Sequence, residues 1–258
     1  MCHKSVDLAF ILDASGTIDD SQWKLTKDFV QGVSNGFRLA SNGTRISIVT
    51  YSTLPHIERR FDDLNHNDNL IGFLESMSQP RGDTRTDRAL KAVRDQLIIS
   101  EAGARDFTPK AIVIVTDGGD KHDTTARFAE QRARELKDMD GATIVALGVG
   151  NKVDQYELRQ LASDPDHAFL VASYDDIIGY VKSAADAVCT GERNNNFLRM
   201  SYLELKLPDI MSIFLVIRLS QSIWLFGSRE TFRTYFGSHI PLRLQKKDAL
   251  LYKLLQFF

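Results

Sequence analysis

Cysteine is scarce in this sequence, and so is an excess of charge of either sign. Two cysteines, Cys2 and Cys189, stand in 258 residues, which excludes a disulfide-dense mini-protein and a four-cysteine zinc site. Six histidines are scattered without the spacing of metal ligands. The 32 basic and 34 acidic residues leave a formal net charge of −2, so nothing points to nucleic acid as a partner. With 43% apolar and 26% charged residues, the composition is that of an ordinary globular protein.

Signals for nucleotide binding and for membrane insertion are also lacking. The sequence has no phosphate-binding loop and no Gly-x-Gly-x-x-Gly fingerprint. The one stretch long enough to consider as a membrane span, 210–227, has Arg218 near its middle, so we expect no span. No secretory signal precedes the first apolar run, which indicates either a cytosolic protein or part of a longer chain.

The composition changes towards the C-terminus. Residues 1–191 carry 22 basic and 29 acidic side chains, whereas residues 192–258 carry 10 and 5. We therefore predict one domain over residues 4–189 and a C-terminal extension over residues 193–258. The extension contains no motif, and it is either a poorly ordered segment or sequence translated from beyond a true exon. We assign it no structure and no function.

Within the predicted domain, short apolar runs alternate with longer polar segments that have helical spacing. This alternation is typical of an α/β fold: a Rossmann-like, doubly wound, mainly parallel sheet of about six strands flanked by helices. The expected buried strands are 6–14, 45–52, 111–116, 143–149 and 168–172, and a half-polar run at 56–61 predicts an edge strand. The apolar stripes of the expected helices run over 23–33, 90–98, 128–136, 156–161 and 177–185.

Oxygen-bearing side chains stand at the places where a sheet of this kind binds ligands, just beyond the strands. Asp13, Ser15 and Thr17 follow the first strand, and in an extended turn their side chains can point the same way. Asp117 follows the strand at 111–116, and Thr84 precedes an expected helix. Two carboxylates and three hydroxyls form a donor set suited to Mg²⁺ or Mn²⁺. Because the set carries few negative charges, a bound metal would keep enough positive charge to bind a carboxylate from another molecule.

The motif Asp-x-Ser-x-Thr at 13–17, followed by Thr84 and then Asp117, resembles the metal-ion-dependent adhesion site of a von Willebrand factor type A domain. The resemblance covers residues 4–189 and does not extend to the C-terminal segment. The family's first motif has a second serine where this chain has Thr17, a change that keeps the hydroxyl group.

The resemblance implies a role for each of these residues. Ser15 and Thr17 would bind the metal directly, and Asp13 would bind it directly or through water. Thr84 would switch between direct and water-mediated contact, and Asp117 would stand behind the ligands. A Glu or Asp of a partner protein would complete the shell. The implied function is therefore not enzymatic: it is Mg²⁺- or Mn²⁺-dependent adhesion to an extracellular matrix or cell-surface protein.

The resemblance also bears on the two cysteines. In extracellular members of the family a disulfide recurs between the two ends of the domain, which implies a bond between Cys2 and Cys189 and hence a secreted protein. An Asn-x-Thr glycosylation sequon at 42–44 agrees with that compartment. Two unpaired thiols in a cytosolic protein are the alternative.

Two other functions stay open at this point. The first is an intracellular type A domain that organises a protein complex through the same site. The second is a Mg²⁺-dependent phosphatase of the haloacid-dehalogenase kind, whose first motif is Asp-x-Asp-Gly-Thr. Ser15 stands where that family needs its general acid, and a hydroxyl does not serve as one at neutral pH.

Overall fold

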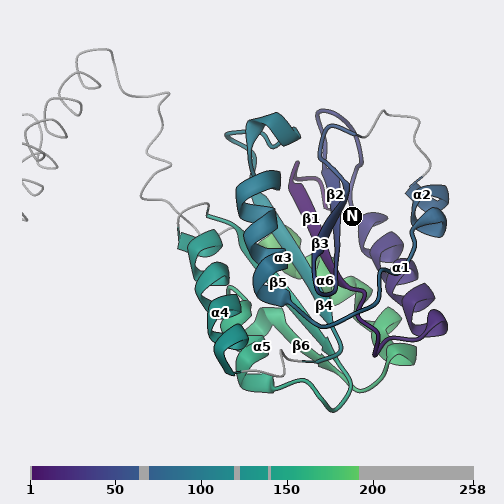
Figure 1. Ribbon diagram of the computed structural model, residues 1–258. Coiled ribbons are helices and arrows are strands. Elements are labelled where there is room, and N and C mark those ends of the chain that lie inside the picture. The colour runs from purple at the N-terminus through teal and green to yellow at the C-terminus, as the bar shows by residue number, and fades with distance from the viewer. Residues whose placement is uncertain (1, 64–69, 119–122, 139–140, 192–258) are drawn as a thin grey trace, which may run out of the picture. The chain divides into compact units, whose positions relative to one another are not determined.

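A computed structural model describes residues 2–63, 70–118, 123–138 and 141–191 (Figure 1). They belong to the first of two units into which the chain divides, Met1–Arg193. The predicted extension at 193–258, with the stretch around Arg218, lies outside the described residues, so the domain boundary stays a prediction. In the described part of the chain, no helix is both long and apolar enough to cross a membrane.

Six strands form one sheet in the order β3-β2-β1-β4-β5-β6. All neighbouring strands run parallel except β2 and β3, which confirms the mainly parallel sheet and the edge strand expected from the sequence. The strands are β1 (Asp7–Asp13), β2 (Arg45–Tyr51), β3 (Pro55–Arg59), β4 (Lys110–Thr116), β5 (Thr143–Val149) and β6 (Ala168–Val171).

Every residue of the central strand β1 is buried. Leu8 and Phe10 pack into the core on one face of the sheet, whereas Ala9 and Ile11 pack into the core on the other. Side chains alternate between the two faces of a strand, so a continuous apolar run requires cover on both.

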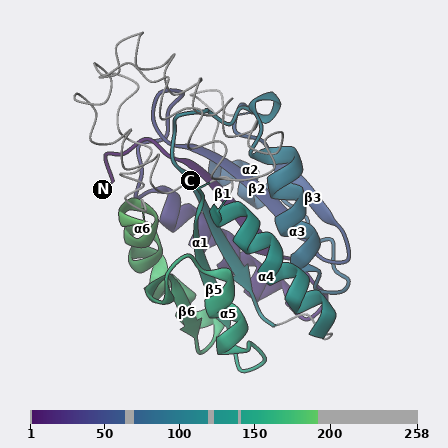
Figure 2. The ribbon, with the colours of Figure 1, turned by 90° about the vertical axis from the view of Figure 1, so that its left-hand side faces the viewer.

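Helices provide that cover (Figures 1 and 2). Buried residues of α1, α2 and α6 join the core on one face, and those of α3, α4 and α5 join the core on the other. The seven-residue α2 has no counterpart in the sequence prediction. The helices are α1 (Asp20–Ser34), α2 (Leu70–Ser76), α3 (Thr86–Ala92), α4 (Asp123–Asp138), α5 (Gln155–Leu161) and α6 (Val181–Thr190).

Three members of the predicted apolar stripes do not face the core. Phe128, Tyr156 and Ile178 are 50%, 69% and 44% exposed. The buried positions beside two of them are Ala129 and Ile177, which are 4% and 0% exposed. Helical spacing therefore located the segments correctly but assigned these three side chains to the wrong side.

The strand order creates two distinct edges. We call the edge formed by the C-terminal ends of the parallel strands the carboxyl edge, and the opposite one the amino edge. β1 lies between β2 and β4, so the order reverses at β1. The chain leaves β1 for α1 on one face and leaves β4 for α4 on the other. Such a reversal opens a crevice between the two connections at the carboxyl edge.

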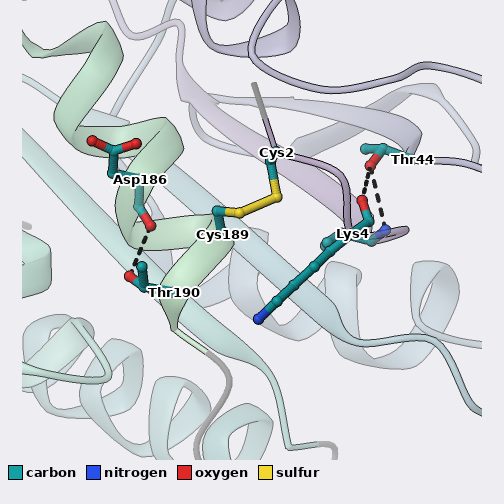
Figure 3. Close-up of a disulfide and its surroundings, with 7 residues drawn as sticks. Cys2, Lys4, Thr44, Asp186, Cys189 and Thr190 are labelled. Atoms are coloured by element: carbon teal, nitrogen blue, oxygen red, sulfur yellow. Dashed lines mark hydrogen bonds between the residues drawn. A yellow bond between two sulfur atoms is a disulfide. The ribbon is translucent and has the colours of Figure 1, made fainter.

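A disulfide joins the two ends of the described domain. Cys2 precedes β1 and Cys189 lies in the last turn of α6, and their Cα atoms are 5.9 Å apart (Figure 3). This confirms the pairing that the family resemblance implies. The bond closes a loop with a sequence separation of 187 residues.

Replacing both cysteines in a Cys2→Ser/Cys189→Ser variant should lower the free energy of unfolding by up to about 5 kcal/mol, because a long closed loop restricts the unfolded chain. Denaturant unfolding of the two proteins measures the difference. Since the cysteines lie away from the carboxyl edge, Mg²⁺ affinity of the folded variant should match the wild type. Equal unfolding midpoints would contradict the role of the bond.

Candidate metal centre

The first loop of the candidate site follows β1 directly. Asp13 is the last residue of β1 and is 1% exposed, and its Oδ1 accepts a hydrogen bond of 2.9 Å from the backbone N–H of Ser15. The Ser15 hydroxyl is buried and lies 3.0 Å from the hydroxyl of Thr17, which is exposed. A carboxylate and two hydroxyls thus stand together where the interior meets the surface.

The end of β4 brings a second carboxylate to the same edge. Thr116 Oγ1 lies 3.0 Å from Asp13 Oδ2 and 2.9 Å from the carbonyl oxygen of Gly118. Asp117 follows Thr116 and is half-buried, and its negative charge helps to raise the pKa of Asp13. Both acids can therefore act on one cation.

Thr84 arrives on a second loop that is hydrogen-bonded to the first. The backbone N–H of Arg81 donates to the carbonyl of Ala14, and that of Gly16 donates to the carbonyl of Gly82, each at 2.9 Å. Gly82 has a φ of +127°, and a Cβ there would come within 2.8 Å of a neighbouring hydroxyl, so the loop requires glycine at this point. Thr84 is half-buried and makes no side-chain hydrogen bond to another described residue.

A comparison within β1 shows what Asp13 lacks. Asp7, at the other end of the strand, is 0% exposed and is neutralised by Arg105, whose Nε and Nη2 donate to Oδ1 at 2.8 and 2.6 Å. Lys110 Nζ lies 3.3 Å from the other oxygen of Asp7. Among the described residues, no basic side chain pairs with Asp13. Asp13 is thus about as deeply buried as Asp7, but no positive charge of the described residues compensates its own.

The consequence for Asp13 is a raised pKa. Burial is the largest cause, the charge of Asp117 adds to it, and hydrogen bonds from Ser15 and Thr116 oppose it; together they raise the pKa of Asp13 from 3.8 to about 6. A buried carboxylate without a positive partner favours either a proton or a cation.

The donor set fits a hard divalent cation. Among the described residues there is no group of three or more His, Cys, Asp or Glu side chains that could hold a metal. A cation at the carboxyl edge would therefore need hydroxyl oxygens beside Asp13. Ser15 and Thr17 lie on the loop that follows it, and Thr84 lies on the loop that is hydrogen-bonded to that one. Carboxylate and hydroxyl oxygens suit Mg²⁺ or Mn²⁺ better than a soft metal.

Sequence reasoning missed two residues that support this edge. Gln79 Nε2 donates to the carbonyl oxygens of Ser15 and Ile18, at 3.0 and 2.9 Å, and so ties the first loop to the second. Tyr174 is buried, and its pKa is raised first by burial and then by the charges of Asp117 and Asp13. Neither residue belongs to a motif, because one binds backbone and the other acts through packing.

The sequence also contains a Gly-x-Ser-x-Gly pattern at 32–36, which in some hydrolases marks a nucleophile. Here Ser34 is the last residue of α1 and is 0% exposed, and its hydroxyl donates to the carbonyl of Val30 at 2.6 Å. A nucleophile elbow instead places its serine exposed between a strand and a helix, so this pattern is structural.

The family model for the von Willebrand factor type A domain matches residues 7–182, which contain both loops and the end of β4. The chain belongs to the von Willebrand factor type A family. The type A domain accounts for the whole described sheet, and the match confirms the family resemblance.

Similar proteins include several with a type A domain inside a longer chain. Cuticlin-6 of Caenorhabditis elegans is 27% identical over 68% of this chain and 29% of its own length. A von Willebrand factor A domain-containing protein 2 of Xenopus laevis is 31% identical over 71% of this chain and 22% of its own. Matrilin-1 of Gallus gallus is 27% identical over 73% of this chain and 37% of its own length. The chain thus spans well under half the length of these relatives.

Among solved structures, proximal thread matrix protein 1 from the mussel byssus has the same fold. It superimposes with a TM-score of 0.68 at 21% identity, over 73% of this chain and 49% of that one. A further structure of that mussel protein, with a TM-score of 0.67, has a zinc-occupied metal-ion-dependent adhesion site. At this identity the likeness establishes the fold of the type A domain alone.

The charge of Asp13 should make the chelated type A domain less stable at neutral pH than at acid pH. Since the folded pKa of about 6 exceeds the ordinary value of 3.8, the folded state binds more protons between these values, and stability from this group rises as pH falls. Asp13→Asn should therefore be more stable than wild type at pH 7, and its advantage should shrink by about 2 kcal/mol towards pH 4.

Unfolding curves recorded in chelator at a series of pH values measure the difference in stability between Asp13→Asn and wild type. Adding Mg²⁺ at pH 7 should remove that difference, because only the wild type binds the ion. Asn fits the site because Thr116 Oγ1 can accept from its amide and donate to Gly118 instead. Parallel pH curves for the two proteins would show that Asp13 does not carry the uncompensated charge.

Gln79→Leu should weaken Mg²⁺ binding by up to about tenfold, because it removes two hydrogen bonds that fix the first loop, each worth about 1 kcal/mol. Titration calorimetry measures the affinity. Gln131→Leu, which removes an exposed glutamine bonded to Glu135 on α4, should leave the affinity unchanged. Equal affinities in both variants would mean that Gln79 does not position the loop.

Proposed function

We propose that this type A domain is a metal-dependent protein-binding module for adhesion. In this proposal Asp13, Ser15 and Thr17 hold Mg²⁺ or Mn²⁺ with Thr84, and Asp117 adds its charge from behind. A Glu or Asp of the partner protein takes a remaining coordination position. The module has no catalytic role: the domain binds and releases, and no bond is made or broken.

The observation that carries the proposal is the uncompensated charge of Asp13. β1 ends in a buried carboxylate at each edge, and only the one at the amino edge has basic partners among the described residues. A buried charge without a partner costs several kcal/mol, so the carboxyl edge favours a cation. In the proposal, the hydroxyls of Ser15, Thr17 and Thr84 supply neutral oxygen ligands; the 3.0 Å contact between the first two supports this.

The nature of the ligands supports an acidic partner. A cation held by one direct carboxylate and by hydroxyls keeps most of its positive charge. It therefore attracts a further carboxylate, which a partner protein can supply from its surface.

The relatives and the disulfide support the proposed class of partner protein and the proposed extracellular location. Similar chains include a matrilin and the collagen alpha-1(XXI) chain, and the mussel protein of the same fold is a thread matrix protein. The bond between Cys2 and Cys189 is of a kind that persists outside the cytosol. We infer an extracellular protein whose partner belongs to the matrix or to a cell surface.

The alternatives receive less support. An intracellular type A subunit would keep its two cysteines reduced, whereas here they are bonded. A haloacid-dehalogenase-like phosphatase needs a second acid where this chain has Ser15, and that side chain is a buried hydroxyl beside Thr17. The match to the type A family leaves no separate observation in favour of a phosphatase.

Adhesion of the full chain to a surface coated with matrix extract should require Mg²⁺ or Mn²⁺ and the Thr17 hydroxyl. Thr17→Ser keeps the oxygen and should adhere like wild type, whereas Thr17→Ala should lose about tenfold or more in affinity, since a ligand is missing. Surface plasmon resonance with and without chelator measures both.

A second surface, whose carboxyl groups have been converted to amides, tests the partner's chemistry. The chain should bind it no better with Mg²⁺ than with chelator. Undiminished binding to that surface, or by Thr17→Ala, would contradict the proposed function.

A further inference from the structure

The loop between α1 and β2 contains a sequence whose first residue neither the metal site nor the core uses. Asn42-Gly43-Thr44 is the one Asn-x-Ser/Thr sequence in the 258 residues. Such a triplet is the acceptor for N-linked glycans when the chain passes through the secretory pathway. Asn42 is exposed at the amino edge, immediately before β2.

The geometry around Asn42 leaves its amide nitrogen accessible. Arg38 Nη2 donates to Oδ1 at 3.2 Å, and Ser5 Oγ donates to the backbone carbonyl of Asn42 at 2.9 Å. Within the described residues, Nδ2 of Asn42 has no hydrogen-bond partner. The side chain of this exposed residue is thus held by its oxygen, and no hydrogen bond to a described residue engages the nitrogen.

We propose that Asn42 carries an N-linked oligosaccharide. In the transfer, Asn42 Nδ2 forms a bond to the anomeric carbon of an oligosaccharide carried on a lipid-linked diphosphate. The bond from that carbon to the diphosphate oxygen breaks, the diphosphate leaves with the electron pair, and the amide loses one proton. The donor is the co-reactant that the secretory pathway supplies, so the inference rests on the proposed extracellular location.

The structure also indicates when the transfer must occur. Thr44 is 0% exposed, and its hydroxyl donates to the carbonyl of Lys4 at 3.2 Å and accepts from the N–H of Val6 at 3.3 Å (Figure 3). That hydroxyl is the part of the acceptor sequence that distinguishes Asn-x-Thr from other triplets. Since folding buries it beneath the N-terminal segment, the transferase must act before the domain folds.

The glycan would not obstruct the metal site. In register, Arg45 of β2 pairs with Asp7 at the start of β1, whereas Asp13 pairs with Tyr51 at the opposite end. At about 3.3 Å for each residue of a parallel strand, seven-residue strands separate the two edges by roughly 20 Å. We therefore expect the glycan and the metal-dependent adhesion to be independent.

The first experiment expresses the full chain behind a cleavable secretory signal in eukaryotic cells. Wild type should lose the mass of one oligosaccharide when treated with peptide-N-glycosidase, which converts the glycosylated Asn to Asp. Asn42→Gln should show no such loss. Asn35→Gln, the same change at the exposed C-cap of α1 outside any sequon, should behave like wild type.

Thiol alkylation of the same secreted sample separates this inference from the proposed location. Secreted protein with the Cys2–Cys189 bond intact but without a glycan would overturn the site at Asn42 and leave the location standing. Free thiols together with the absence of a glycan in the secreted protein would overturn the location and the inference together.

The second experiment tests the timing with unglycosylated full chain, purified oligosaccharyltransferase and its lipid-linked donor. Full chain that is reduced and alkylated in denaturant, and that circular dichroism shows to stay unfolded after dilution, should be modified at Asn42, whereas the native, oxidised protein should be modified at least tenfold more slowly. Equal rates would show that the buried Thr44 hydroxyl does not control the transfer.

Discussion

The candidate site at the carboxyl edge depends on the Asp13 carboxylate, which the fold buries away from water. β1 is the central strand of a sheet with helices on both faces, so its last residue is as deeply buried as its middle. A carboxylate in that position has lost its hydration. Hydrogen bonds from Ser15 and Thr116 replace only part of the lost stabilisation, and the pKa of Asp13 is therefore raised to about 6. The loops around Asp13 can be understood as the parts that let a cation approach this one charge.

The register of the sheet explains why the two ends of β1 differ. On β4, the residue paired with Asp7 is Lys110, so the neighbouring strand itself helps to neutralise the acid. At the other end of the same two strands the position beside Asp13 belongs to Thr116, which offers a hydroxyl and no charge. The cross-strand partner, together with Arg105 from the loop before β4, thus separates a structural ion pair from a candidate binding site. The amino edge thus has its buried charge neutralised within the chain, whereas at the carboxyl edge no basic side chain of the described residues does this.

The sequence was sufficient to predict what depends on local pattern. Continuous apolar runs located the strands to within two residues, and the polar residues that follow them marked the carboxyl edge, because parallel strands all end there. The family resemblance, not the pattern, implied the disulfide. What could not be predicted depends on distant partners: Gln79 donates to backbone carbonyls more than sixty residues away, and Tyr174 is buried where the charges of Asp117 and Asp13 reach it. The pattern did not predict the helix α2, and it assigned Phe128 to the core because helical spacing does not fix which of two neighbours is buried.

The choice of hydroxyls over acids in the loops decides what kind of site this can be. If Ser15 or Thr17 were carboxylates, the ligands of this chain would neutralise the charge of the cation. An acidic side chain of a partner would then be repelled rather than attracted. With hydroxyls there, the cation is held less tightly and retains charge for an external ligand. Asp117 is half-buried, whereas Thr17 is exposed, and the charge of Asp117 already acts on Asp13; in the proposal it would add attraction for the cation without taking a ligand position. In the proposed function, a weakly charged shell would therefore couple metal binding to partner binding, since each would supply part of what the other lacks.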